Sequence, residues 1–196
     1  MSVKRDLVTA LRLFAVLAVL FGALYTLLVL GVLQSLFPTQ ANGDLVVRHG
    51  RVVGSRLIGQ SFTGPGWFHG RPSATVSATG RSDPYNAMNS GGSNLGPHNP
   101  LLVRAVRQAM AAYPGIPARR IPPSLVESSA SGLDPDITPR SAYLQVPRVA
   151  RSAHLRRSAL MALVRRHVHG PWLGLFGHAR VNVLELNLAL VRLEHR

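Results

Sequence analysis

The stretch LFAVLAVLFGALYTLLVLGVLQSL, Leu13–Leu36, decides the architecture of this chain, because it carries no charged residue over its whole length. A helix rises about 1.5 Å per residue, so this stretch spans roughly 36 Å, against a bilayer hydrocarbon core of about 30 Å. Water offers such a helix no way to bury its circumference, whereas lipid covers it on every side. We therefore predict one transmembrane helix over residues 13–37, and no second long apolar run follows it.

Two other interpretations of this stretch compete with a membrane anchor. A cleavable signal peptide has an apolar region of about 7 to 15 residues and a small-residue cleavage site. The apolar run is longer than that, and Thr39–Ala41 matches such a site only weakly. A buried core helix would need an apolar enclosure that the rest of the sequence does not supply. The membrane anchor is therefore the favoured interpretation.

The short segment before the apolar run predicts its orientation. Lys4, Arg5 and Arg12 precede the helix, and only Asp6 opposes their charge. Basic residues close to a membrane span stay on the cytoplasmic side. We expect residues 1–12 to form a cytoplasmic tail and residues 38–196 to form an extracytoplasmic domain, so that the protein crosses the membrane once.

Composition narrows the classes of partner for this domain. The formal net charge is +14 and comes almost wholly from arginine, because Lys4 is the only lysine. A basic balance of this size favours lipid headgroups or acidic protein surfaces. Nucleic acid is not expected as a partner, because the basic residues are scattered and no zinc-finger, RNP or helix-turn-helix pattern is present. The absence of cysteine excludes disulfides and thiol catalysis.

The domain should have a mixed α/β (α+β) fold with a small sheet and three to four helices. Helices are predicted where a capping residue precedes proline, as at Asn99-Pro100 and Thr138-Pro139. Pro147 should stop or kink the second of these helices, because proline cannot donate an interior hydrogen bond. The remaining predicted elements are a hairpin over 45–47 and 51–58, a helix over 148–168, a strand over 180–183 and an ambiguous segment over 184–193, for which we favour a helix.

Two irregular loops carry the polar groups most able to do chemistry. Asn89–Pro97, NSGGSNLGP, lies in a long run without regular structure and could present backbone N–H groups to an anion in front of the helix that follows. It lacks the Gly-Lys-Ser/Thr ending of a P-loop, and the alternative is a structural turn. In Ser128–Pro139, Asp134 and Asp136 are suited to acid/base chemistry or cation binding, or more simply to Asx turns and helix capping.

Catalytic and metal-binding signatures are missing from the sequence. There is no G-x-S-x-G elbow of a serine hydrolase, and the eight histidines never form H-E-x-x-H. We expect no catalytic residue and no metal site. The eight histidines are His49, His69, His98, His154, His167, His169, His178 and His195.

A series of short motifs gives the chain a specific resemblance. They occur in the order seen in the C subunit of the Kdp-type potassium-transporting ATPase, the KdpC family, and the resemblance covers nearly the whole chain, including the anchor. Several co-linear motifs are far more specific than any one of them. The motifs are Leu57–Gln60, Phe68–Ala74, Ser90–Pro97, Ser129–Pro135, Arg148–Ala150 and Val181–Leu184.

The resemblance implies a non-catalytic accessory subunit of a bacterial, high-affinity, ATP-driven potassium pump. In such a complex a channel-like subunit selects potassium and a P-type ATPase subunit hydrolyses ATP. The C subunit resembles a catalytic chaperone that assembles the complex and raises the ATP affinity of the ATPase subunit, with no tightly bound cofactor and with ATP reached only through the complex. The nucleotide or partner contacts that it implies are Gln60, Ser90, Gly91, Gly92, Ser93 and Asn94.

Two further sets of residues are predicted to meet partners. Ser129, Ser131 and Asp134 are expected to form a partner-facing loop. Small residues in the membrane helix let a neighbouring helix approach closely, although such residues are also common in membrane helices generally. The small residues expected to pack in this way are Gly22, Ala23, Thr26 and Gly31.

The predicted orientation conflicts with direct nucleotide contact. A domain outside the membrane cannot touch cytoplasmic ATP, so any effect on ATP affinity would have to travel as a coupling between pump states. The alternative function is that the domain covers the side at which ions enter the potassium-selective subunit, without contact to nucleotide. An anchored hydrolase and an anchored small-molecule binding protein are the remaining classes, and neither has a complete set of site residues in the sequence.

Overall fold

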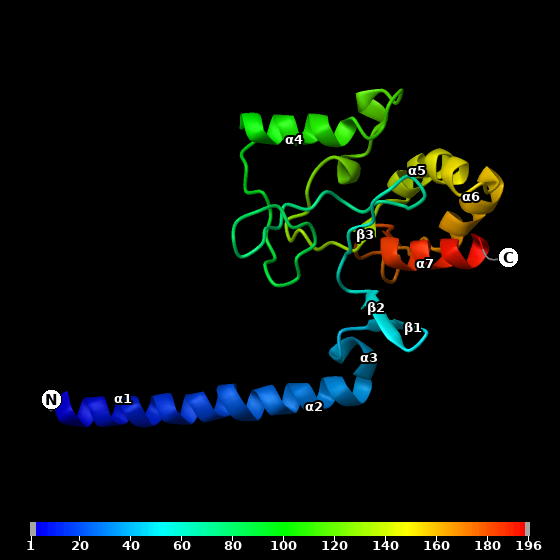
Figure 1. Cartoon of the computed structure of the whole chain (residues 1–196). Coiled ribbons are helices and arrows are strands. Elements are labelled where there is room, and N and C mark those ends of the chain that lie inside the picture. The colour runs from blue at the N-terminus through cyan, green and yellow to red at the C-terminus, as the bar shows by residue number, and fades with distance from the viewer. Residues whose placement is uncertain (1–2, 195–196) are drawn as a thin grey trace. The chain divides into compact units, whose positions relative to one another are not determined.

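The computed structural model describes residues 3–194 and divides the chain into two compact units, Met1–Leu45 and Val46–Arg196. The first unit is one helical rod, which consists of α1 (Val3–Leu17), a π-helical segment η1 (Ala18–Tyr25) and α2 (Thr26–Leu36), followed by the short α3 (Pro38–Ala41) (Figure 1). The rod has 34 residues, and none of its most apolar window is buried within the chain. It is long and apolar enough to cross a membrane, and it begins ten residues before the predicted span, since helix propensity continues through the charged tail.

The second unit begins with the predicted hairpin, β1 (Leu45–Arg48) and β2 (Arg51–Ser55). The two residues that connect these strands, His49 and Gly50, both have positive φ, as the tight turn of a two-residue hairpin requires. The second strand was expected to reach Ile58, which is wrong. It ends at Ser55, which then pairs with Ile58 across a local turn.

A second pair of strands joins distant parts of the chain. β3 (Asp136–Ile137) pairs antiparallel with β4 (Val181–Asn182), with Ile137 opposite Val181. The described residues thus contain two separate two-stranded sheets, β1-β2 and β3-β4. The mixed α/β class with very little sheet is confirmed.

Two helices of the domain begin at the prolines that the sequence predicts. α4 (Pro100–Met110) and α5 (Pro139–Ser152) start with proline after capping side chains, since Asn99 accepts a hydrogen bond from Leu101 N at 2.9 Å and Thr138 accepts one from Ser141 N at 3.2 Å. The segment between them contains the single-turn 3₁₀ helices η2 (Ala118–Arg120) and η3 (Pro123–Leu125). The last helices are α6 (Arg157–Arg166) and α7 (Val183–Glu194), which confirms a helix for the ambiguous segment.

Pro147 does not stop α5. The prediction that a separate helix begins at residue 148 is therefore wrong. α5 continues to Ser152, and the break lies at 153–156, where His154 has a φ of 54°. Proline removes one interior hydrogen bond, but Val146, Val149 and Ala150 on the same helix are buried, and their burial outweighs that loss. Tertiary packing overrides the local signal.

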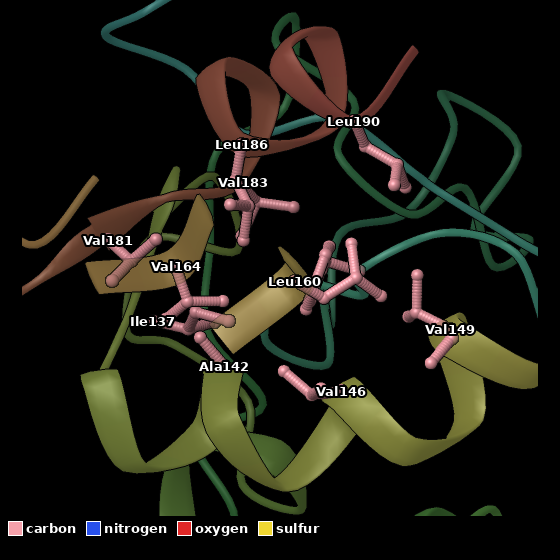
Figure 2. Close-up of a cluster of buried hydrophobic side chains, with 12 residues drawn as sticks. Ile137, Ala142, Val146, Val149, Leu160, Val164, Val181, Val183, Leu186 and Leu190 are labelled. Carbon is pink, nitrogen blue, oxygen red and sulfur yellow. The ribbon is translucent and has the colours of Figure 1, made fainter. Parts of the chain in front are cut away.

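The main core lies where α5, α6 and α7 pack beside β3 and β4. α5 packs against α6, and α6 packs against α7. Figure 2 shows the apolar side chains of these helices pointing toward one another, with Leu160 of α6 facing Leu186 and Leu190 of α7. All three leucines are fully buried. The aromatic residues of the Gly/Pro-rich loop over 62–71 join this core, because Phe68 is fully buried and Phe62 and Trp67 pack at its edge.

Candidate functional site

The Gly/Pro-rich loop over 62–71 is held in place by two buried amide side chains. The Asn187 side chain of α7 accepts from Phe68 N and donates to Phe68 O, both at 2.9 Å. The Gln145 side chain of α5 accepts from His69 N at 2.8 Å and donates to His69 O at 3.0 Å. Each amide is 1% exposed and satisfies both backbone groups of one residue, as a neighbouring β-strand would do. These two side chains therefore replace a sheet partner.

Arg148 holds the other side of the same loop. Its guanidinium donates to Pro65 O at 2.8 Å, to Trp67 O at 2.9 Å and to Gln145 Oε1 at 2.6 Å. Burial lowers the pKa of Arg148, although the guanidinium stays charged at neutral pH. Burial likewise lowers the pKa of His69, which donates from Nε2 to Gly64 O at 2.6 Å. The cation and the imidazole therefore serve the loop and do not face solvent as free groups.

The two loops singled out in the sequence lie against each other. The amide N–H of Gly91 donates to Ser131 O at 2.9 Å, and Ser90 Oγ donates to the same oxygen at 3.0 Å. Ser73 Oγ donates to Gly132 O at 2.8 Å and so ties a third segment to them. We call residues 90–94 and 129–134 the joined loops. The structure thus brings the predicted contact residues Ser90–Asn94 together with the predicted partner-facing residues Ser129, Ser131 and Asp134.

Glycine is required at the contact between the joined loops. A Cβ at Gly92 would lie 2.8 Å from Ala130 O, and one at Gly132 would lie 2.7 Å from Gly91 O. Gly132 also has a φ of +68°, which side-chain-bearing residues rarely adopt. The close approach of two backbones therefore explains the glycines of this motif.

This contact predicts opposite results for neighbouring glycines. Gly92→Ala should lower the free energy of unfolding by about 1 to 2 kcal/mol, because the new methyl group meets a backbone oxygen that cannot rotate away. Gly91→Ala is the matched control, since a Cβ there meets nothing within 4 Å, and its stability should be unchanged or slightly raised. Urea denaturation of the full chain in detergent, followed by near-UV circular dichroism, measures both. Equal stabilities for the two variants would contradict the proposed contact.

Tyr85 packs next to Arg71 and Ser73, and no pattern in the sequence pointed to it. Its ring lies against Gly59 and Gly70, where an added Cβ would clash with it. Its hydroxyl donates to Arg71 O at 2.6 Å, and its backbone N–H donates to Ser73 Oγ at 3.0 Å. Burial, with a smaller effect from the Asp134 carboxylate, raises the pKa of Tyr85 to about 12. The phenol is therefore neutral and acts as a hydrogen-bond donor.

The Asp134/Asp136 pair is divided between two arginines. Asp134 accepts from Arg71 Nη1 at 3.2 Å and from the Asp136 backbone N–H at 3.0 Å, which is the Asx turn considered from the sequence. Asp136 pairs with Arg180 at 3.1 Å, while burial raises its pKa. The helix cap is Thr138 and neither aspartate. Each carboxylate therefore has its own structural partner, and no shared cation is needed to hold the pair.

Gln60 lies at the hairpin. Its Nε2 donates to Val53 O at 2.9 Å, and its side chain occupies the space left by Gly54, whose φ is +158°. The hydrogen bonds described for Gln60 do not reach the joined loops. A nucleotide or partner contact by Gln60 or by Ser90–Asn94 stays a prediction.

The surface beside the joined loops is hollowed on two sides. A depression of about 530 Å³ is lined by Leu57, Ile58, Arg71 and the residues 129–131 and 133–135. A cleft of about 660 Å³ runs between the 61–73 segment, Tyr85 and α4. Within residues 3–194, no three or more His, Asp or Glu side chains are grouped so that they could hold a metal ion, and His195 lies outside the described residues. The joined loops with these hollows are the candidate site.

The small residues of the membrane helix leave open space on its surface. A Cβ at Gly22 or Gly31 would meet nothing within 4 Å. Thr26 Oγ1 donates to Phe21 O at 3.2 Å, five residues back, at the end of the π-helical segment that contains Ala23. Packing of these residues against a partner helix stays a prediction.

Comparison with known proteins identifies the family. The family described as "KdpC: K+-transporting ATPase, c chain" matches residues 7–192. The chain belongs to the KdpC family. It is 50% identical over 194 residues to the potassium-transporting ATPase KdpC subunit of Methylorubrum extorquens, with 95% of this chain and 96% of that protein covered. It is 53% identical over 191 residues to the KdpC subunit of Polaromonas naphthalenivorans, with 95% and 94% covered.

Membership in the KdpC family confirms the resemblance drawn from the co-linear motifs. The chain is a KdpC subunit of a potassium-transporting ATPase, a membrane transport complex with further subunits. The match covers both the apolar helix and the domain that carries the joined loops.

Proposed function

We propose that this KdpC chain is a non-catalytic accessory subunit that assembles and stabilises the pump and acts as a catalytic chaperone for its P-type ATPase subunit. The observation that carries the proposal is the apolar helix Val3–Leu36, which has Lys4, Arg5 and Arg12 in its first part, in a chain whose residues 7–192 match the KdpC family. One span with Lys4, Arg5 and Arg12 near its start supports an amino terminus in the cytoplasm of a bacterial cell and a domain outside.

The effect on ATP affinity is then exerted through the membrane. Gly91 N–H and Ser90 Oγ, which an anion could have used, both donate to Ser131 O. The Gln60 amide donates to Val53 O within the hairpin. These engaged donors favour a coupling between pump states over direct contact with the nucleotide. A coupling of this kind changes ligand affinity by about 5- to 150-fold in characterised allosteric systems.

The second function that we propose is bracing of the potassium-selective subunit where ions enter it. The chain has 22 Lys and Arg residues against 8 Asp and Glu residues. Such a surface repels potassium ions, so its cations are better placed against lipid or an acidic partner than along the ion path. Covering the entry side in this way requires no nucleotide and agrees with the proposed orientation.

Thiol labelling tests the orientation. Ser152 is exposed at the end of α5, and the chain has no native cysteine, so Ser152→Cys introduces a unique reactive group. In intact cells that express the whole complex, an impermeant maleimide should label this variant fully, as it does after lysis. A cysteine at Ser2, in the cytoplasmic tail, is the matched control and should be labelled only after lysis. Labelling of Ser152→Cys only after lysis would overturn the extracytoplasmic placement and restore direct nucleotide contact.

A further inference from the structure

An exposed apolar hairpin lies between α6 and α7. His169 pairs with Arg180, and Trp172 pairs with Phe176, so residues 169–180 form a narrow two-stranded projection that we call the Trp172 hairpin. Its four large apolar side chains are among the most exposed in the second unit. Their exposed fractions are 68% for Trp172, 70% for Leu173, 80% for Leu175 and 61% for Phe176. Apolar exposure gathered at one point, and not scattered, marks an interaction site.

The requirements of folding do not explain why a leucine occupies the turn of the Trp172 hairpin. Leu175 N and Phe176 N both donate to Trp172 O, which closes a tight turn with Leu173 and Gly174 at its centre. Both central residues have positive φ, 52° and 73°. Such turns take Asn or Gly at these positions, and leucine there adopts a strained backbone. Leu173 thus contributes neither core packing nor a favourable turn, and strain of this kind collects at functional sites.

The base of the hairpin indicates what covers its tip. Arg180 pairs with Asp136 at 3.1 Å, and His169 Nε2 lies 3.6 Å from Glu185 Oε2. The base of the hairpin therefore carries charges of both signs, which include the carboxylates of Asp136 and Glu185. A surface that enters an anionic bilayer carries cations around its apolar residues, whereas a protein interface combines an apolar centre with a mixed polar rim. Trp is also the residue type most enriched among interface hot spots.

We propose that the Trp172 hairpin is a docking element that inserts into an apolar pocket, rimmed by charges of both signs, on another subunit of the same ATPase complex. The proposal rests on the accessory role proposed above, in which the surface of the domain meets other subunits of the complex. A rigid turn that presents Trp172, Leu173 and Leu175 outward loses little conformational freedom on binding.

Polar substitution at the tip separates docking from folding. In the double variant Leu173→Asn with Leu175→Ser, recovery of the other subunits with tagged full-length chain from detergent-solubilised membranes should fall tenfold or more. The melting temperature of the free full-length chain should be unchanged or higher, because asparagine suits the turn. The matched control is Leu101→Ser on α4, an exposed leucine outside the hairpin, which should leave recovery unchanged. Full recovery with the double variant would overturn the proposal.

Photo-crosslinking identifies the occupant. A benzophenone amino acid at Leu175 in the assembled complex should give one adduct with another subunit, located by mass spectrometry to an apolar segment. Adducts with lipid only, adducts with a second copy of this chain only, or no adduct would each overturn the proposal. A subunit adduct together with labelling of Ser152→Cys only after lysis would retain the docking site and reject the proposed orientation. Labelling of Ser152→Cys in intact cells without a subunit adduct would retain the proposed orientation and reject the docking site.

Discussion

The full-length Gln145→Leu variant is expected to lose about 4 kcal/mol of unfolding free energy, or to fail to accumulate as a folded protein. The Gln145 side chain satisfies both backbone groups of His69 and accepts from Arg148, at distances between 2.6 and 3.0 Å. Leucine removes these partners, so the N–H and the carbonyl of half-buried His69 lose theirs, and the half-buried guanidinium of Arg148 loses one acceptor. Each unsatisfied buried group costs about 1 to 3 kcal/mol.

The control for this variant is Gln108→Leu, because Gln108 is exposed on α4 and its side chain makes none of the hydrogen bonds described for the 62–71 loop. Its unfolding free energy in urea should differ from that of the unmodified chain by less than about 0.5 kcal/mol. A Gln145→Leu chain as stable as the Gln108→Leu chain would show that the amide does not serve as the partner of the loop. Circular dichroism of both chains in detergent provides the comparison.

The second large effect is expected at alkaline pH. The pKa of Tyr85 is raised from 10.0 to about 12, so between these values the folded state retains a proton that the unfolded state loses. Stability from this group is fully present below pH 10 and is lost as the pH rises toward 12. A difference of this size corresponds to about 2 to 3 kcal/mol. Few other groups titrate in this range, because the chain has no cysteine and only one lysine.

Urea denaturation at a series of pH values from 8 to about 12 measures this dependence. Tyr85→Phe should flatten the loss of stability above pH 10, and at pH 8 it should cost about 1 kcal/mol, because Arg71 O loses its donor. Burial also raises the pKa of Tyr113, so a smaller alkaline slope should remain in the variant. An unchanged slope in Tyr85→Phe would show that the phenol is not buried as described.

The candidate site was predictable in its parts but not in its assembly. The motif resemblance singled out both joined loops. Nothing in the sequence indicated that Gly91 donates a hydrogen bond to Ser131, a residue about 40 positions away. Tyr85, whose ring lies against Gly59 and Gly70, is in a run without regular periodicity, and no sequence pattern pointed to it. The sequence carried a weak signal for Asn187, because this residue is an amide on the apolar face of the helix predicted over 184–193. A buried amide at such a position points to an unpaired backbone elsewhere.

The sequence by itself determined the apolar helix, the caps at Asn99 and Thr138, and membership in the KdpC family, because these depend on neighbouring residues or on several motifs in order. Only the tertiary structure decided that α5 continues through Pro147 and that Gln145 and Asn187 replace a sheet partner for the 62–71 loop. Both outcomes depend on contacts between residues 76 and 119 positions apart or on burial against other helices. Such contacts decide the structure because burial and satisfied backbone groups outweigh local preference.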